Sequence, residues 1–383
     1  MRQETSRNRI VPQKPPDAAV IGRPGRSYNP PMTTEPSLAD SVPAANRWAV
    51  SDADHAARRA GPVWGTLDDW RVVEIDGPDA LPFFHGQSTA DIAAMTGASW
   101  QLGGVCTAKG RLLAIYQAWR TDTGLALLMP AELAAGFARR LGMFVLRAKA
   151  TVRDAGERWQ ARFVLGSGAA AVLAEEGLPA PAAPWQCGPV SGYTEARIAR
   201  LPGGAQCAER FLVVERAGQP VAAMDAVARR VPRAGAGLWH WSQIDAAVPD
   251  IFAATQERFV PQAVNLEVLG GVSFRKGCYP GQEVVARSQF LGKLRRRLAL
   301  VHAPAIGPTL DVFHDDEAGP KAEPVGYLVQ AASVAGPDGV GGWDALIECP
   351  TQVTETGVLR LGAPDAPPAA LRPLPYPIFD PTA

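Results

Sequence analysis

Residues 260–287 read VPQAVNLEVLGGVSFRKGCYPGQEVVAR and form the least ordinary stretch of this 383-residue sequence. Glycines follow Leu269 and lie on both sides of Cys278, and each lets the backbone adopt geometry that a side chain would obstruct. Pro280 suits the first turn of a helix, because its φ is already helical and its missing N–H would be unpaired there in any case. The stretch therefore predicts a glycine-rich loop that leads into a short helix running to Arg287.

Cys278 is the residue of this stretch best suited to chemistry. It would lie just before the N-terminus of that helix, with Arg275 and Lys276 beside it. Both the helix dipole and neighbouring cations stabilise a thiolate, which is how a reactive cysteine is made. A buried, inert thiol on a structural loop is the alternative that the spacing leaves open.

The charge balance of the chain limits its partners. Lys and Arg together number 38, as do Asp and Glu, so the formal net charge is zero. Such a chain does not wrap nucleic acid over its whole surface, although a local basic patch is compatible with it. No apolar run approaches the roughly 18 residues of a membrane span, and the polar start is not followed by a signal-peptide core. We therefore expect a cytoplasmic protein with no membrane partner.

The cysteines and histidines do not follow metal or disulfide spacings. None of the five cysteines forms a C-x-x-C pair, and none of the five histidines forms H-x-x-x-H or H-E-x-x-H. We therefore expect free thiols and no metal site. His85 and His240 are interpreted as structural, with a pocket position as the alternative for each. A G-x-S-x-G elbow is also missing, which argues against a serine hydrolase.

Two further motifs have an ordinary and a functional interpretation. Gly166-Ser-Gly-Ala-Ala-Ala171 fits the dinucleotide-binding pattern G-x-G-x-x-A. Such a site also needs a strand about 20 residues later that ends in an acidic residue to hold the ribose, and none follows here. A tight turn is therefore favoured over a dinucleotide site. Lys293-Leu-Arg-Arg-Arg297 is the densest basic run. It predicts either a solvated strand face or a contact with the phosphates of RNA or another polyanion.

Proline content sets the two ends apart from the rest of the chain. Eight prolines precede residue 45, which predicts a disordered N-terminal extension over residues 1–60. Seven more lie between Pro364 and Pro381 and predict a Pro-rich tail over residues 364–383. Between the ends, strand-like and helix-like segments alternate, and from Arg296 onward only strands and turns remain. That last part suggests a small barrel or sandwich.

The stretch Lys276-Gly-Cys-Tyr-Pro-Gly-Gln-Glu283 resembles the K-G-C-Y-x-G-Q-E signature of the YgfZ family of folate-binding or tRNA-modifying proteins. Elements of the family's other motifs occur in the same order and cover about residues 66 to 330. They are TLDDW at 66–70, GQSTAD at 86–91, CTAKGR at 106–111, PQAVNL at 261–266 and LGGVSF at 269–274.

This resemblance implies a fold and a division into domains. The family is similar to the glycine-cleavage T protein, an aminomethyltransferase that acts on tetrahydrofolate. We therefore expect an α+β fold of three domains, with mixed β-sheets flanked by helices around a central folate site and a small C-terminal β-barrel. The implied domains are residues 61–150 with 239–290 for the folate-binding domain that carries the KGCYPGQE motif, 151–238 for a second α+β domain, and 291–363 for the barrel.

The resemblance also implies a cofactor, tetrahydrofolate, and residues that bind it. Trp70 of the T-L-x-D-W element and Trp239 would stack on the flat pterin, with the folate docked between them. Trp241 lies close enough in sequence to replace Trp239. The family's I-E-A-G-x-P reads Ile244-Asp-Ala-Ala-Val-Pro249 here, so Asp245 would accept hydrogen bonds from the aminopyrimidine edge in place of a longer glutamate. Asp91 is the other acid expected at the folate.

Three functions follow from these expectations. The first is a tetrahydrofolate-binding accessory protein for assembly or repair of iron–sulfur clusters in client enzymes, including those that modify tRNA. Its partners would be those clients or cluster-assembly proteins, and Cys278 with Lys276 would be its reactive pair. The alternative is a folate-dependent aminomethyltransferase, with Asp91 or Asp245 as general acid or base. A third is direct binding of tRNA, supported only by the basic run at 293–297.

Overall fold

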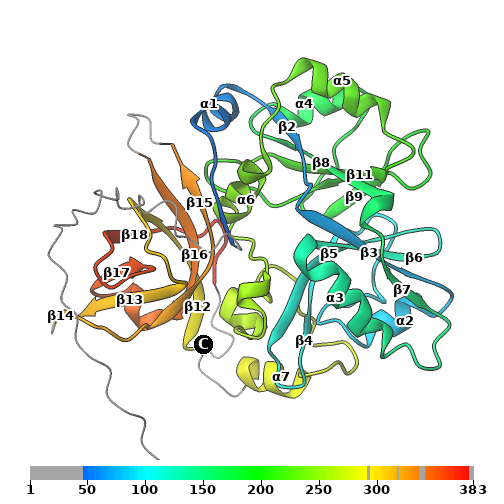
Figure 1. The fold of residues 1–383 in the computed structure, drawn as a ribbon. Coiled ribbons are helices and arrows are strands. Elements are labelled where there is room, and N and C mark those ends of the chain that lie inside the picture. Colours follow the sequence, from blue (N-terminus) through cyan, green and yellow to red (C-terminus); the bar gives the residue numbers. More distant parts are fainter. Residues whose placement is uncertain (1–45, 291–293, 317–318, 336–340, 379–383) are drawn as a thin grey trace, which may run out of the picture. The chain divides into compact units, whose positions relative to one another are not determined.

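The computed structural model describes residues 46–290, 294–316, 319–335 and 341–378, and its strands form three sheets within those ranges (Figure 1). The first is antiparallel and has the strand order β4-β5-β6-β3-β7. Strand β5 is a nearly continuous run of buried residues, as expected of a strand covered on both faces. The strands are β3 (Trp70–Asp76), β4 (Gln101–Cys106), β5 (Leu112–Arg120), β6 (Gly124–Pro130) and β7 (Thr151–Asp154).

Two helices accompany the first sheet. Helix α3 (Ala131–Gly142) is amphipathic: it buries Leu133, Phe137 and Leu141, which recur every four residues and so share one face. Its packing partners are strands β3, β6 and β7. Helix α2 (Ala80–His85) follows β3 and ends at Gly86.

The second sheet has the order β2-β8-β11-β10-β9 and is joined to the first by Glu74. This buried carboxylate of β3 accepts hydrogen bonds from Trp159 Nε1 at 2.8 Å and from Arg216 Nη1 at 2.5 Å. The elements are β2 (Val63–Thr66), β8 (Trp159–Leu165), β9 (Gln186–Pro189), β10 (Arg197–Arg200), β11 (Arg210–Arg216), α4 (Ala169–Glu175) and α5 (Ala222–Arg230).

The third sheet closes on itself. Its strands follow the order β15-β16-β12-β18-β17-β13, and β13 pairs back to β15, which makes a six-stranded barrel. Strands β1 and β14 extend it at β15 and β13. The elements are β1 (Arg47–Trp48), β12 (Arg296–Ala303), β13 (Asp311–Asp316), β14 (Gly319–Pro320), β15 (Gly326–Val334), β16 (Gly342–Pro350), β17 (Val358–Leu361) and β18 (Pro368–Arg372). The predicted α+β class and C-terminal barrel are confirmed.

Helix α6 (Ala236–Asp245) is buried on every side. Its last eight residues have no solvent exposure, and four of them are polar. Asp245 forms an ion pair with Arg372 of β18 at 2.9 Å, and Arg372 also pairs with Asp344 of β16 at 2.7 Å. Trp241 donates to the same Asp344 at 3.0 Å. The helix is thereby attached to the barrel through paired polar groups.

The second sheet attaches to α6 in the same manner. Arg210 of β11 is completely buried and donates through Nε to Ser242 Oγ at 3.0 Å. Its Nη2 donates to Gln243 Oε1, and its guanidinium lies 4.9 Å from the ring centroid of Trp239. The C-terminal half of α6 is therefore fixed by two arginines that come from different sheets.

The N-terminal extension is shorter than predicted. Residues 52–60, which were assigned to it, form helix α1 (Asp52–Ala60). Ser51 caps this helix by accepting the N–H of Asp54 at 3.0 Å, and the buried His55 holds it against the carbonyl of Ser333 at 2.9 Å. The disorder prediction is therefore wrong for residues 46–60, while residues 1–45 lie outside the described ranges.

The Pro-rich tail also begins later than predicted. Residues 368–372 form β18, which pairs with both β12 and β17 and completes the barrel. The barrel therefore extends past the predicted boundary at residue 363, because pairing with two neighbours outweighs the low strand propensity of proline at one end.

The ion pairs of Arg372 give a stability prediction. Arg372→Ala leaves the buried carboxylates of Asp245 and Asp344 without their shared cation, and removing one partner of a buried pair costs about 3–5 kcal/mol. Because both carboxylates keep other donors, we expect a loss near the lower figure in urea denaturation. The control Arg71→Ala removes a partly exposed pair with Asp154 and should cost less, about 1 kcal/mol or below. Equal losses would contradict the structural role of Arg372.

Candidate functional site

The predicted glycine-rich loop that carries Cys278, which we call the thiol loop, packs on the turn between β4 and β5. Gly281 adopts a left-handed φ of +81°, and a Cβ there would collide with the carbonyl oxygen of Thr107 and with Gly110. Helix α7 (Gln282–Phe290) begins directly afterwards, which confirms the helix predicted at this position. Cys278 is exposed in front of the helix, so the loop presents a thiol to solvent from a rigid base.

Lys276 ties this loop to the chain that follows α2. Its Nζ donates to the backbone carbonyl of Ser88 at 2.6 Å and to that of His85, and it lies 5.1 Å from the ring centroid of Tyr279. The side chain is 9 % exposed. Burial lowers the pKa of Lys276 to about 8, while the charge of Asp91 opposes this shift. Lys276 therefore positions the loop and carries an amine that loses its proton more readily than an ordinary lysine.

Asp91 lies in the same group as Lys276 and Cys278. One of its carboxylate oxygens is 3.4 Å from Nδ1 of His85 and accepts the N–H of Ala94 at 3.2 Å. Burial and the charge of Lys276 lower the pKa of His85, and Asp91 raises it. We call Cys278, Lys276, His85 and Asp91 the thiol site.

The other four cysteines are unlike Cys278. All four are buried. Burial raises the pKa of Cys106 to about 12, that of Cys187 to about 11 and that of Cys349 to about 12, and it also raises the pKa of Cys207. Because only a thiolate is nucleophilic, these thiols are inert in the folded protein.

A second group of predicted residues is aromatic. Trp70, which begins β3, and Trp239 of α6 touch edge to face, with ring centroids 6.3 Å apart and planes at 88°. Beside them, Trp48 of β1 stacks on His240, with centroids 3.6 Å apart and planes at 6°. Phe252 closes the group at 5.0 Å from Trp48. We call these five residues the ring cluster.

The ring cluster has hydrogen-bonding capacity that the described residues leave unused. The indole nitrogens of Trp70 and Trp239 and Nδ1 of His240 are buried, and within the described ranges none of these atoms has a partner. The other imidazole nitrogen of His240 lies 2.5 Å from the carboxylate of Asp69. Burial lowers the pKa of His240, and Asp69 raises it. A small cavity of about 200 Å³ lies on the Trp70 side, lined also by Asp68 and Trp159.

The arrangement corrects one detail of the predicted folate contact. Because Trp70 and Trp239 touch each other, a flat ring cannot enter between them, and any stacking has to use another face of either indole. Trp241 is a weaker candidate than Trp239. Its indole N–H donates to Asp344, while Arg58 lies 4.5 Å from its ring centroid and His55 meets it edge-on.

Asp245 lies in neither group. Its Oδ2 accepts the backbone N–H of Gln206 at 2.8 Å and that of Cys207 at 2.9 Å, while Oδ1 faces Arg372. These donors belong to the chain itself and occupy both carboxylate oxygens, so the predicted contact with an aminopyrimidine edge finds no free oxygen. The structure thus gathers Cys278, Lys276 and Asp91 in one place and Trp70 and Trp239 in another.

Three residues in or beside the ring cluster were not anticipated from the sequence, namely Trp48, Phe252 and Asp69. Trp48 fell inside the predicted extension, and nothing in its surroundings signalled a ring contact. Asp69 stands next to Trp70 and is the acidic position of the T-L-x-D-W element, which was the sequence signal for its pairing with His240. Gly166 and Gly168 both have left-handed φ values ahead of α4, which agrees with the tight turn predicted for that motif.

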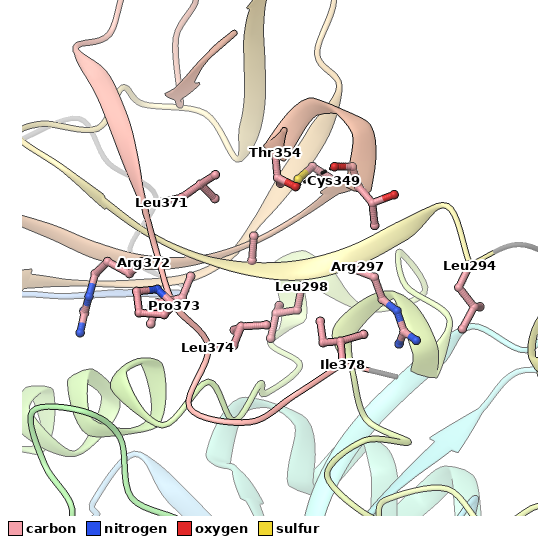
Figure 2. A pocket seen from close by; sticks show the side chains of 13 residues that line it. Leu294, Arg297, Leu298, Cys349, Thr354, Leu371, Arg372, Pro373, Leu374 and Ile378 are labelled. Atoms are coloured by element: carbon pink, nitrogen blue, oxygen red, sulfur yellow. Dashed lines mark hydrogen bonds between the residues drawn. The ribbon is translucent and has the colours of Figure 1, made fainter. Parts of the chain in front are cut away.

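A larger pocket of about 590 Å³ lies beneath β12 and β18 (Figure 2). Leu298, Leu371, Leu374 and Ile378 give it an apolar wall, and its arginines already have partners, Arg297 with Glu267 and Arg372 with two carboxylates.

In the described part of the chain, no group of three or more His, Cys, Asp or Glu side chains could hold a metal ion. No helix there has the length and apolarity to cross a membrane.

The sequence was compared with known proteins. No protein-family model matches it. The tRNA-modifying protein YgfZ of Klebsiella pneumoniae (strain 342) is 35 % identical over 235 residues, which is 61 % of this chain and 69 % of that protein. The tRNA-modifying protein YgfZ of Escherichia coli O7:K1 (strain IAI39 / ExPEC) is 33 % identical over 240 residues, 63 % of this chain and 72 % of the other.

Among solved structures, the chain resembles the glycine cleavage system aminomethyltransferase T from Bartonella henselae. The TM-score is 0.63 at 16 % identity, and the match covers 84 % of this chain and 88 % of that one. At this identity the likeness concerns the fold, and it confirms the predicted T-protein-like architecture.

The burial of four cysteines predicts selective alkylation. Iodoacetamide at pH 8 should add one carbamidomethyl group to the native chain, at Cys278, and none to Cys278→Ser. Mass spectrometry of the intact protein measures this directly. In urea, the wild type should take five groups and the variant four. A second adduct on the native protein would show that another thiol is accessible.

The lowered pKa of Lys276 predicts a dependence of stability on pH. Its pKa is about 8 when folded and 10.5 in the unfolded chain, so between these values the unfolded chain binds more protons and this group makes stability rise with pH. Lys276→Met removes the titration. We compare the free energy of unfolding of the wild type with that of Lys276→Met. The difference, wild type minus variant, should rise by on the order of 3 kcal/mol between pH 8 and pH 10.5. A constant difference across that window would contradict the burial of a charged amine.

Proposed function

Because the chain belongs to the YgfZ family, we propose that it is a tetrahydrofolate-binding accessory protein for iron–sulfur enzymes. It would support assembly or repair of clusters in client enzymes, including those that modify tRNA, with Cys278 as its reactive thiol. The relatives are named tRNA-modifying proteins, which supplies the tRNA context. Work beside tRNA-modifying enzymes also implies a place in the cytoplasm.

One observation carries this proposal, the contrast between Cys278 and the other cysteines. Cys278 is exposed on a loop that Lys276 and Gly281 hold rigidly, whereas the remaining thiols are buried. A cysteine that serves only packing is buried, so an exposed cysteine on an anchored loop indicates a chemical role. A single thiolate cannot hold an iron–sulfur cluster by itself, so the remaining ligands would come from the client.

The ring cluster supports the folate part of the proposal. Indole N–H groups are donors, and those of Trp70 and Trp239 have no acceptor among the described residues. A pterin offers carbonyl and ring-nitrogen acceptors together with a flat face, so the cluster fits its chemistry. The cavity of about 200 Å³ is smaller than the roughly 300–1,000 Å³ of typical ligand pockets, so it has room for one part of a folate. When bound, tetrahydrofolate would supply a carrier of one-carbon groups.

The positions of the acids favour an accessory role over the alternative, an aminomethyltransferase. Asp245 has no free oxygen, and Asp91 belongs to the thiol site. That site packs at the end of β4, and two strands separate β4 from β3, where Trp70 lies. Three strand spacings of about 4.8 Å amount to roughly 14 Å. Asp91 is therefore too far from the ring cluster, and Asp245 has both oxygens occupied, so neither acid is placed as a general acid or base has to be.

Folate binding and the thiol can be tested together. Titration with tetrahydrofolate should quench tryptophan fluorescence saturably in the wild type and in Cys278→Ser. Trp70→Phe and Trp239→Phe should weaken the binding, because they remove the unpartnered donors and keep most of the ring volume. Trp343→Phe, in the barrel, is the matched control and should bind as the wild type does.

The same variants separate the two parts of the proposal in cells. Cys278→Ser should fold and bind folate but fail to restore the activity of iron–sulfur enzymes in a strain that lacks this protein. Full complementation by Cys278→Ser would remove the reactive thiol from the proposal. Absence of any folate binding would remove the cofactor while leaving the thiol in place.

A further inference from the structure

Five arginines line a second pocket of about 710 Å³, whose lining includes no residue of the thiol site or of the ring cluster. They come from four separate parts of the sequence and meet between α7 and the barrel. We call this the arginine pocket. Arg111 comes directly before β5, Arg258 precedes the short turn at 261–264, and Arg287 lies on α7. Arg295 directly precedes β12, and Arg296 is the first residue of that strand.

Only one of these five charges is neutralised within the pocket. Glu348 is the single acid among the described lining residues, and it forms a two-pronged pair with Arg296, whose Nη2 lies 2.7 Å from its Oε2. Arg111 and Arg258 donate to backbone carbonyls, which leaves their positive charge in place. The side chains of Arg287 and Arg295 form no hydrogen bond or ion pair with any described residue, and the backbone carbonyl of Arg295 is engaged by the N–H of Thr351 at 2.8 Å. Four positive charges therefore face one cavity.

This concentration is not explained by general basicity. The chain as a whole has no net charge, and like charges that converge in a partly enclosed space repel one another. A cleft lined by one sign of charge focuses its field and attracts ions of the opposite sign. The pocket is therefore built for an anion that carries several negative charges.

The shape and the side chains indicate which anion. A guanidinium presents its N–H groups as a fork that matches the oxygens of phosphate or carboxylate. The volume lies within the range of sites that hold ligands of nucleotide size. The pocket also contains an aromatic wall, Tyr327, with the guanidinium of Arg258 lying 4.7 Å from its ring centroid. Planar surfaces of this kind receive nucleobases, which phosphate esters of nucleosides carry and simple polycarboxylates do not.

We propose that the arginine pocket is a binding site for phosphate esters of nucleosides, either the backbone of an RNA or a free nucleotide. The site is distinct from the ring cluster and does not depend on folate binding. Arg287 lies on the same helix that follows Cys278, about 8 Å along α7 from its first residue. A bound nucleotide or RNA segment is therefore held beside the loop that presents the thiol.

The test removes the two arginines without partners. Arg287→Ala/Arg295→Ala takes two charges from the pocket without leaving a buried acid unpaired, which Arg296→Ala would do at Glu348. The matched control is Arg139→Ala/Arg140→Ala, which removes two exposed charges from the last turn of α3. Binding of fluorescein-labelled tRNA is followed by anisotropy, and binding of ATP by calorimetry. Each lost contact between an arginine and a phosphate should weaken binding about tenfold or more.

The expected result is that the pocket variant loses at least tenfold in affinity for its phosphate ligand while the control binds as the wild type does. If RNA is the ligand, the slope of log affinity against log salt should also fall by about 1.4 to 1.8, because two phosphate contacts are lost. Arg287→Lys/Arg295→Lys should recover part of the affinity, since it keeps the charge and loses the fork. Tetrahydrofolate binding should be unchanged in all three variants, which keeps this test independent of the proposed function.

Two arms distinguish the source of the phosphate. Binding of tRNA that ATP does not displace assigns the pocket to RNA, and saturable ATP binding that displaces tRNA assigns it to a free nucleotide. The proposal is overturned if the pocket variant and the control bind both ligands equally, or if the wild type binds neither. It is also overturned if an oligomer of glutamate binds in the pocket and neither phosphate ligand does.

Discussion

A helix that is buried on every side has to find a partner for each of its polar groups, and this constraint on α6 organises the rest of the structure. Ser242, Gln243 and Asp245 all lie at zero exposure. Unpaired, each would cost free energy, and the carboxylate most of all. Their partners are Arg210 from the second sheet and Arg372 from the barrel, so the pairing fixes two sheets against one helix.

The same constraint decides what α6 can offer a ligand. Asp245 is fully used by two backbone N–H groups and Arg372, so its carboxylate acts within the fold. Trp239 and His240, on the same helix, each keep a ring nitrogen without a partner among the described residues. The helix therefore combines groups that hold the sheets together with ring nitrogens that remain available, and the proposed folate would use the second kind for its hydrogen bonds.

Local features were predictable where neighbours in sequence determine them. The helix at 282–290 depends on nearby residues, and it occurs where the sequence analysis expected it. Helix α1 escaped prediction because the partner of His55, Ser333, lies 278 positions further along the chain. Strand β18 escaped it because its pairing with β12 joins residues such as Val301 and Leu371, which are not neighbours in sequence. The folate contact of Asp245 failed for the same reason, since its cation, Arg372, lies 127 positions further along the chain.

The arginine pocket illustrates the difference between a charge run and a charged site. The run at 293–297 was visible in the sequence, yet two of its arginines are neutralised, Arg296 by Glu348 and Arg297 by Glu267. Among the described residues of the run, 294–297, only Arg295 brings an uncompensated charge, and it lines the pocket together with Arg287 of α7. Because α7 also follows the thiol loop, the fold brings an anion site and an exposed cysteine to one short helix. An accessory protein whose clients act on RNA gains from this arrangement, since the bound phosphates bring their bearer to the thiol.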